Sequence, residues 1–475
     1  MIETYTRMLP HQEAAFSKLV HLKIGALYME MGTGKTRTAI ELIKSRADRG
    51  KISGVIWLCP CSVKRNLELD IRKHSNLLDI GFVEICGIET LSSSVAENSR
   101  LMAYVRDRKV MLIVDESSLV KNHAALRTIH ITQLAQKCPY RLILNGTPVS
   151  KNEADLYSQW YLLDPRILGY RSFWSFAANH LEYDNTGRVR RVLNIDYLAE
   201  KIAPYTYQCL QKDCITLPPK KHSYLPIWLT VEQDAEYENA VSILLDQVDE
   251  MRPETIYRLF GALEAVICGY RLDISKQTYH VSRHRMYSWN DHPRINAMMR
   301  ELPQDEKYLI FATYTDDITD ICRRINSDRG EGMAVPFYGE IPQARRQQNL
   351  ERFRGPAQFL VANKMCGAYG LNLQFCHNII YYSNDWDYGT RIQSEDRVHR
   401  LGQTEEVSIT DVYARGTIDE QIIRCLDRKE RIVDNFKQEI GSKKDIIDFL
   451  HGKKVKVIGK DLSAGKRVRR GHGAH

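Results

Sequence analysis

The sequence lacks the long apolar runs of a membrane-spanning chain. No stretch of its 475 residues approaches the ~18 consecutive apolar residues that cross a bilayer. The first ten residues, Met1 to Pro10, do not show the basic-then-apolar pattern of a secretion signal. We therefore expect a cytoplasmic protein with no membrane partner.

Closely spaced cysteines are also scarce. Among 11 cysteines, only Cys59-x-Cys61 and Cys209-x4-Cys214 are near neighbours, and neither pair is followed by the second Cys or His pair of a structural zinc site. We expect no structural metal. An odd cysteine count without a secretion signal predicts free thiols in a reducing compartment.

Excess positive charge is nearly absent outside the C-terminal end. The formal net charge is +8, but residues 452–475 hold five Lys, three Arg and one Asp, which leaves residues 1–451 with only +1. We expect this end to be a disordered basic tail. Its charge can pair with nucleic-acid phosphates or serve only for solubility, and the composition favours neither reading.

The rest of the composition is that of a globular chain. Hydrophobic residues make up 43% and charged residues 27%, and at ~150 residues per domain the length suggests about three units. Short apolar runs alternate with helical patterns and form two groups, which predicts two α/β lobes with parallel sheets around a mostly helical middle. The runs are Gly54–Cys59, Val110–Val114, Arg141–Leu144, Tyr308–Ala312, Phe359–Ala362, Ile379–Tyr382 and Val407–Tyr413.

Two local patterns mark the ends of the lobes. Adjacent prolines in Leu217-Pro218-Pro219-Lys220 cannot continue a helix or a central strand, so this segment is expected to link the lobes. Thr417-x-x-Glu420 has the spacing of a capping box, and apolar residues then recur at helical spacing as far as Ile440. We expect a long helix there that braces the second lobe.

A glycine-rich loop follows the first predicted strand. Gly25–Met29 reads as a strand, the next residues as the loop Glu30-Met31-Gly32-Thr33-Gly34-Lys35-Thr36, and the chain then turns helical. Such a loop directs backbone N–H groups at a polyphosphate, so Lys35 is expected to reach the β/γ oxygens of ATP and Thr36 to bind Mg²⁺. Met29 stands where the general pattern has its first glycine. The predicted phosphate contacts are Met31, Gly32, Thr33, Gly34, Lys35 and Thr36.

A pair of carboxylates follows a second apolar strand. Met111-Leu112-Ile113-Val114 runs into Asp115-Glu116 about 80 residues after the loop. Asp115 is expected to hold Mg²⁺, directly or through water, and Glu116 to accept a proton from the attacking water.

With these two elements, the chain resembles superfamily-two helicases, and within them the Swi/Snf-like ATPases, over nearly its whole length. The motif after Asp115-Glu116 has Ser118 in place of the usual His, and the L-T-G-T-P motif has Asn145 in place of Thr. The matching segments are Leu9-Pro10-His11-Gln12, Asp115 to Asn122, Leu144-Asn145-Gly146-Thr147-Pro148, Leu217-Pro218-Pro219-Lys220, Gly370-Leu371-Asn372-Leu373 and Gln393 to Gln403.

The resemblance implies roles for residues far from the loop. Gln12 would read adenine, and Gly370 and Gln393 would join the nucleotide site. Arg397 and Arg400 would stabilise the transferred phosphoryl group, and their i, i+3 spacing predicts that they share a helix face. Thr147, Lys364 and Trp386 would contact DNA, although Trp386 can equally be an ordinary core side chain, and Trp386-Asp387-Tyr388 departs from the family's W-N-P.

The expected fold is α/β, with two RecA-like parallel-sheet lobes and helical insertions between them. We expect lobe 1 over 1–165, helical protrusions and linker over 166–290, lobe 2 over 291–416, a brace helix over 417–451 and the tail over 452–475. The size implies a minimal bacterial or viral type, in the host cytoplasm if viral.

The expected function is an ATP-dependent translocase on double-stranded DNA, a monomer using ATP and Mg²⁺. Sequence specificity should be low because no base-reading module is recognisable. The alternatives are a helicase that separates or anneals strands, and an ATP-gated DNA clamp with little turnover.

Overall fold

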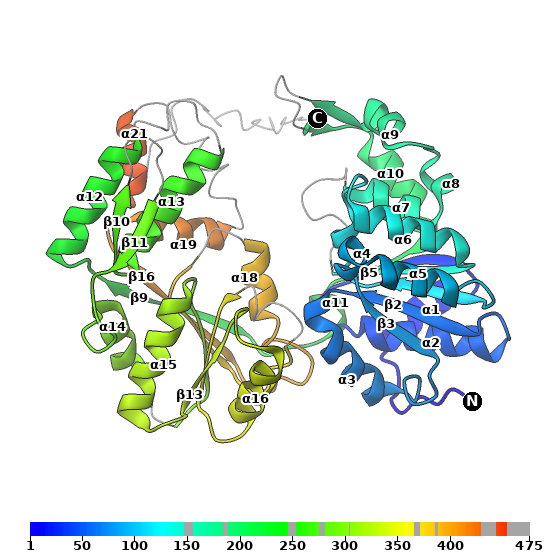
Figure 1. The fold of residues 1–475 in the computed structure, drawn as a ribbon, viewed down its shortest axis with the longest axis horizontal. Helices are drawn as coiled ribbons and strands as arrows, with labels where there is room; N and C mark the ends of the chain where they lie inside the picture. Colours follow the sequence, from blue (N-terminus) through cyan, green and yellow to red (C-terminus); the bar gives the residue numbers. More distant parts are fainter. Residues whose placement is uncertain are drawn as a thin grey trace, which may run out of the picture. The chain divides into compact units, whose positions relative to one another are not determined.

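The computed structural model describes residues 1–146, 155–183, 189–245, 253–274, 281–303, 305–364, 371–384, 388–428 and 443–453. The chain forms two compact units (Figure 1). The first unit contains Met1–Pro218 with two later segments, Tyr369–Gln374 and Asp396–Thr404, and the second contains the rest. The division therefore falls between the two prolines of the predicted linker.

The first unit is built on a six-stranded parallel sheet, in the order β3-β2-β4-β5-β1-β8. Successive side chains of a strand face opposite sides, so Leu112 and Val114 join one core while Met111 and Ile113 join the other. The strands are β1 (Ile24–Met29), β2 (Gly54–Cys59), β3 (Val83–Gly87), β4 (Val110–Val114), β5 (Tyr140–Asn145) and β8 (Thr206–Cys209).

Helices cover both faces of this sheet, as Figure 1 shows. One face carries α1 (Pro10–Leu19), α2 (Lys35–Asp48) and α3 (Lys64–His74). The other carries α4 (Thr90–Ser93), α5 (Val95–Tyr104), α6 (Leu126–Lys137) and α7 (Leu156–Leu163). The remaining elements are α8 (Pro165–Leu168), α9 (Phe173–His180), the hairpin of β6 (Leu181–Tyr183) and β7 (Val189–Val192), α10 (Ile195–Ile202) and α11 (Gln211–Cys214).

The second unit repeats the plan with a parallel sheet in the order β13-β14-β12-β15-β16-β9. Its strands are β9 (Lys220–Ile227), β12 (Tyr308–Phe311), β13 (Ala334–Phe337), β14 (Phe359–Ala362), β15 (Asn378–Tyr381) and β16 (Val407–Ala414). Its helices are α12 (Val231–Leu245), α13 (Pro253–Ile267), α14 (Pro293–Glu301), α15 (Thr315–Arg329), α16 (Gln343–Arg354), α18 (Tyr388–Glu395), α19 (Ile418–Arg428) and α21 (Lys443–Leu450), with a hairpin of β10 (Tyr270–Ile274) and β11 (Val281–Arg285).

The prediction of an α/β protein with two parallel-sheet lobes is confirmed by these two sheets. The predicted middle domain, 166–290, is shared between the units, because β8 belongs to the first sheet and β9 to the second. Most of the predicted brace helix beyond Arg428 lies outside the described residues. At its start, the Glu420 carboxylate accepts the N–H of Gly416 rather than that of Thr417, so the reciprocal capping box is not formed.

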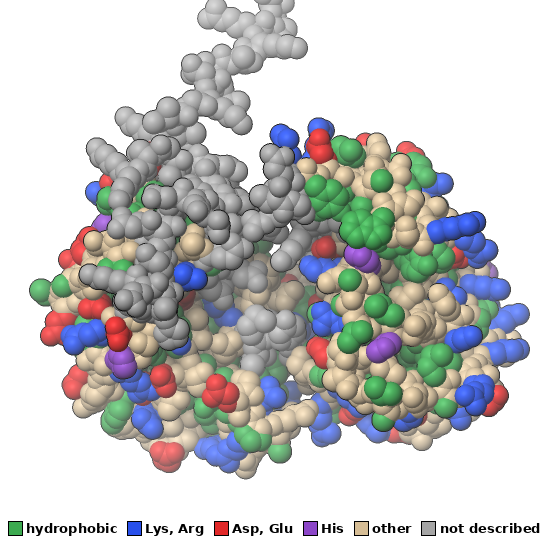
Figure 2. All heavy atoms as spheres, turned by 45° about the horizontal axis from the view of Figure 1, so that its top comes forward, with side chains coloured by type: hydrophobic (Ala, Val, Ile, Leu, Met, Phe, Trp, Pro, Cys, Tyr) green, Lys and Arg blue, Asp and Glu red, His purple; other side chains and the backbone are tan. Residues whose placement is uncertain are grey.

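Charged side chains of both signs lie on the surface. On the face that Figure 2 draws, acidic and basic side chains are interspersed on the second unit, and basic side chains are more numerous along the outer side of the first unit. In the part of the chain that the structure describes, no helix is both long and apolar enough to cross a membrane. The ten cysteines in the same part are free thiols.

Candidate active site

The glycine-rich loop lies in the first unit between β1, which ends at Met29, and α2, which begins at Lys35. Gly32 and Gly34 have φ of +78° and +87°, a conformation that other residues adopt only at a cost. A Cβ on Gly34 would also collide with the Gln12 side chain. Both glycines are thus required by this backbone, as expected of a phosphate-binding loop.

The loop's carbonyl groups are held by side chains around it. The Thr33 hydroxyl donates to Glu30 O at 2.7 Å, and the Lys35 ammonium donates to Met29 O at 2.8 Å. Gln12 is almost fully buried; its Nε2 donates to Thr33 O at 3.0 Å and its Oε1 accepts the N–H of Leu9. Gln12 therefore braces the loop, and its predicted contact with adenine stays a prediction.

The two carboxylates lie at the same sheet edge as the loop. β4 and β1 are both neighbours of β5, and all three strands are parallel, so Asp115 after β4 and the loop after β1 emerge one strand apart. Asp115 is held there by its N–H, which donates to Leu58 O at 2.8 Å. Its Oδ1 accepts the N–H of Glu116 at 2.9 Å. The fold thus brings the predicted catalytic groups of this unit together.

The charges at this edge perturb one another. Burial lowers the pKa of Lys35, and the carboxylates of Glu116 and Asp115 oppose that shift. Burial, with the nearby charge of Glu116, raises the pKa of Asp115 to about 7. A buried lysine ammonium close enough to two carboxylates to feel their charge is the arrangement that a Mg²⁺–phosphate complex would complete.

The two predicted arginines lie in a turn, not on a helix. The helix α18 ends at Glu395, so the prediction that Arg397 and Arg400 share a helix face is wrong. The turn Asp396–Thr404 nevertheless belongs to the first compact unit. There the Arg397 guanidinium lies 3.6 Å from the Met31 sulfur, and the positive charges of both arginines contribute to lowering the pKa of Lys35.

Two further residues contact the loop and were not predicted. The N–H of Gln211, at the start of α11, donates to the Glu30 carboxylate at 2.7 Å, and its Nε2 donates to Met31 O at 3.2 Å. Asp70 on α3 is hydrogen-bonded by His74 and Thr36, and although burial raises its pKa, these bonds lower it overall. Neither belongs to a contiguous motif, so no sequence signal pointed to them.

The remaining predicted residues are only partly described. Thr147, Gly370 and Trp386 lie outside the described residues. Gln393 is half-buried on α18 in the second unit. Lys364 is only 2% exposed, with its ammonium 5.7 Å from the centre of the Tyr381 ring. Its predicted DNA contact stays a prediction, and this burial does not support it.

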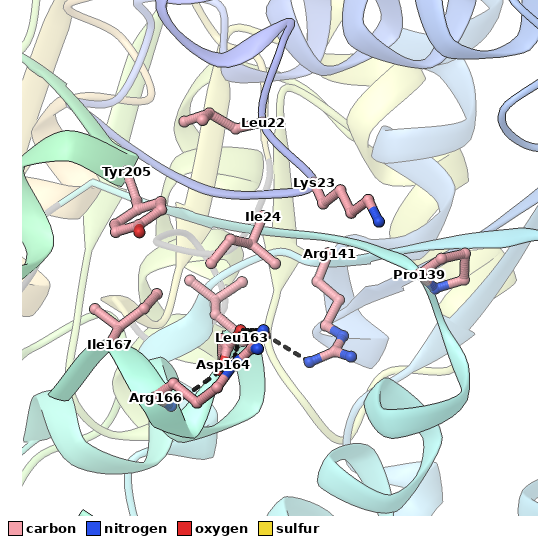
Figure 3. Close-up of a pocket in the computed structure, with 10 residues that line it drawn as sticks. All are labelled: Leu22, Lys23, Ile24, Pro139, Arg141, Leu163, Asp164, Arg166, Ile167 and Tyr205. Carbon is pink, nitrogen blue, oxygen red and sulfur yellow. Dashed lines mark hydrogen bonds and ion pairs between the residues drawn. The ribbon is translucent and has the colours of Figure 1, made fainter. Parts of the chain in front are cut away.

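A cavity of about 660 Å³ lies elsewhere in the first unit, where β1 and β5 begin (Figure 3). Two of its basic side chains are engaged: Arg141 donates to Leu163 O at 2.6 Å, and Arg166 pairs with Asp164. Because the cavity lies where β1 and β5 begin, it is separate from the carboxyl edge of the sheet, which carries the candidate site.

The loop, carboxylates and arginines are of the residue types expected in a nucleotide-hydrolysing site, and comparison with known proteins gives the family. The family model of the SNF2-related domain matches residues 11–268, and the helicase conserved C-terminal domain matches residues 293–402. Because the first match covers more than half of the chain, the protein belongs to the SNF2-related family. It is an ATP-hydrolysing enzyme.

Individual relatives are distant. The chain is 23% identical to an uncharacterized ATP-dependent helicase of Bacillus subtilis over 92% of its own length and 80% of the relative's. It is 25% identical to the CHD3-type chromatin-remodeling factor PICKLE of Arabidopsis thaliana over 95% of its length but spans only 36% of that protein. The Sulfolobus solfataricus SWI2/SNF2 ATPase core in complex with dsDNA matches with 21% identity and a TM-score of 0.41, covering 95% of this chain and 98% of that one.

Proposed function

We propose that the protein is an ATP-driven translocase that moves along double-stranded DNA without sequence specificity. The observation that carries the proposal is the grouping of Lys35, the Asp115–Glu116 pair and the turn of Arg397 and Arg400 in one compact unit. The names of the relatives, an ATP-dependent helicase and a chromatin-remodeling factor, favour DNA as the partner.

The residues present fit ATP with Mg²⁺. Glycines at positive φ leave room for a phosphate beside the loop backbone, and Lys35 supplies a cation. Thr36 and Asp115 offer the hard oxygen ligands that Mg²⁺ prefers, and Mg²⁺ needs only one or two protein carboxylates beside phosphate oxygens. When bound, the ion would neutralise charge on the β- and γ-phosphates.

The side chains of the protein would then have separate catalytic roles. Glu116 would accept a proton from the attacking water. Its position directly after Asp115, the expected Mg²⁺ ligand, would place it near that water. Arg397 and Arg400 would stabilise charge that develops on the transferred phosphoryl group, an effect worth ~10³–10⁵ in rate in other phosphoryl-transfer enzymes.

Two substitutions test this assignment. Lys35→Ala should remove the phosphate contact, and Glu116→Gln should remove the proton acceptor at nearly constant shape. We expect each to reduce duplex-DNA-stimulated phosphate release to background while the circular dichroism spectrum is unchanged. Lys44→Ala on the same helix, where Lys44 pairs with Asp48 at the surface, is the control. Wild-type turnover in either site variant would refute the site.

The second candidate is a helicase that separates or anneals strands, as the name of the Bacillus relative suggests. Displacement of a triplex strand beside unwinding of a fork distinguishes the two. Fork unwinding without triplex displacement would favour the helicase. Near-zero turnover with saturating duplex DNA would instead favour an ATP-gated clamp.

A further inference from the structure

The segment that follows β8 lies directly against the phosphate loop. β8 pairs with β1 in parallel, with Met29 opposite Cys209, so the two strands end side by side. Beyond them, Glu30 N–H donates to Cys209 O at 3.2 Å, and the Glu30 carboxylate accepts the N–H of Gln211 at 2.7 Å. These bonds fix the position of the Gln211 backbone, and its side chain therefore lies against the loop.

The Gln211 amide holds one peptide plane of the loop. Its Nε2 donates to Met31 O at 3.2 Å. In a trans peptide the C=O and the following N–H point in opposite directions. Holding Met31 O toward Gln211 therefore turns the Gly32 N–H away from Gln211.

The close approach of Gln211 to Gly32 is further evidence that the Gln211 amide holds the loop. A Cβ on Gly32 would lie 3.2 Å from Gln211 Nε2, so glycine is the residue that lets this amide come so near. The same Nε2 lies 3.5 Å from His399 O, which is longer than a normal N–H···O bond. The stronger contact of the amide is thus the one to the loop.

We propose that Gln211 is a positioning residue for ATP, which pre-orients the Gly32 N–H toward a phosphate. This inference rests on the proposed ATP site. Without the Gln211 donor, the Met31–Gly32 peptide can rotate. The entropy lost when nucleotide binding orders this peptide then reduces the free energy of ATP binding. The loss should weaken ATP binding by roughly 3- to 10-fold, the range of one net hydrogen bond, with little effect on the chemical step.

The test uses the full chain and variants that differ in donor ability. Gln211→Glu keeps the length of the side chain but places a carboxylate beside Met31 O and the Glu30 carboxylate. Gln211→Lys keeps a donor of sufficient reach and a favourable charge toward Glu30. Gln208→Ala on β8 removes an exposed glutamine from the same segment and serves as the matched control.

The readouts are KM and kcat for ATP with duplex DNA, the Kd of a non-hydrolysable ATP analogue, and the thermal midpoint. We expect Gln211→Glu to raise KM and Kd at least 3-fold with kcat within 2-fold of wild type, Gln211→Lys to recover most of the ATP binding lost in Gln211→Glu, and Gln208→Ala to match wild type. Unchanged Kd in a folded Gln211→Glu variant would overturn the proposal, as would a loss confined to kcat or to the thermal midpoint. If Lys35→Ala retains turnover or the wild type does not bind the analogue, the ATP site itself is wrong.

Discussion

Glu116 has a backbone conformation that is unfavourable for a non-glycine residue. Its φ and ψ are both 53°, in the left-handed region, and among the described residues only Asn194 is another non-glycine residue with positive φ. For an L-residue this conformation costs about 1–2 kcal/mol. A strained residue that directly follows the predicted metal ligand suggests that stability is sacrificed there for the placement of its carboxylate.

Glu116→Gly should therefore separate stability from activity. We expect this variant to lose ATP turnover but to be more stable than Glu116→Gln by about 1 kcal/mol, because glycine relieves the strain that glutamine retains. Urea unfolding of both variants without nucleotide measures the difference. Equal midpoints for the two variants would argue against strain at this residue.

Asp317 is a buried carboxyl that should make the second unit sensitive to pH. It lies on α15, accepts a hydrogen bond from Tyr270 Oη at 2.9 Å, and is 4% exposed. Burial raises its pKa to about 7, although the Tyr270 bond and the charge of Arg294 oppose the shift, and Asp320 and Asp316 add to it. The folded chain thus binds a proton more tightly than the unfolded chain does.

The resulting stability should be present below about pH 4 and lost as the pH rises through 7, because the folded pKa is the higher one. Asp317→Asn removes this titration, so we expect its stability relative to wild type to improve by a few kcal/mol between pH 4 and 8. Chemical denaturation across that range measures it. Asp328→Asn, at a partly exposed position on the same helix, should follow the wild-type profile.

At the scale of elements, α18 is anchored by a buried guanidinium. Arg391 donates to both oxygens of Asp411 on β16, at 2.6 and 2.9 Å, and to Glu395 at 2.7 Å. Its guanidinium also stacks 3.3 Å from the centre of the Tyr381 ring on β15. These contacts fix α18 on its sheet, immediately before the turn that carries the arginines.

Truncating Arg391 should be costly, because it leaves the buried Asp411 carboxylate without its cationic partner, although Glu395 keeps its pair with Lys220. We expect Arg391→Ala to destabilise the chain by about 3–5 kcal/mol. Arg424→Ala, which removes a pair with Glu420 on the surface of α19, should cost less than about 1 kcal/mol. Thermal and urea unfolding of both variants check the contrast; similar small losses would show that Arg391 is dispensable.

The sequence predicts central elements well and edges poorly. β2 and β4 are fully buried and read as continuous apolar runs, so their predicted bounds match the structure. β9 lies at the edge of its sheet, reads Lys-Lys-His-Ser-Tyr-Leu-Pro-Ile and has only its last residue, Ile227, buried, so its pattern resembles a linker. An edge strand has one neighbour and tolerates proline and charge, which removes the apolar signal.

Some residues of the candidate site can be predicted from the sequence and others cannot. Lys35 and Asp115 lie in short contiguous patterns whose spacing is fixed by the turn after a strand, so they can be found from sequence. Gln211 reaches the loop only because β8 pairs with β1, about 180 residues away along the chain. Pairing between distant short strands has no local pattern. The i, i+3 spacing of Arg397 and Arg400 predicts a helix, because spacing alone does not reveal that α18 ends at Glu395.

At the scale of the whole molecule, the charge of the C-terminal end gives the remaining prediction. Residues 452–475 carry +7 of the net +8, whereas residues 1–451 carry only +1. Removing 452–475 should flatten the salt dependence of DNA binding by up to ~0.9 log unit per lost phosphate contact. Titrations at several salt concentrations measure the slope. An unchanged slope would mean that these residues do not bind phosphates.

The first unit is not made of one continuous stretch, because it includes Tyr369–Gln374 and Asp396–Thr404 from much later in the chain. On a ribosome, which adds residues from the N-terminus onward, the first 218 residues emerge well before these segments exist. A nascent chain halted before Asp396 should therefore hold the phosphate loop without its arginines. The proposed site predicts that ATP hydrolysis begins only after synthesis has passed Thr404.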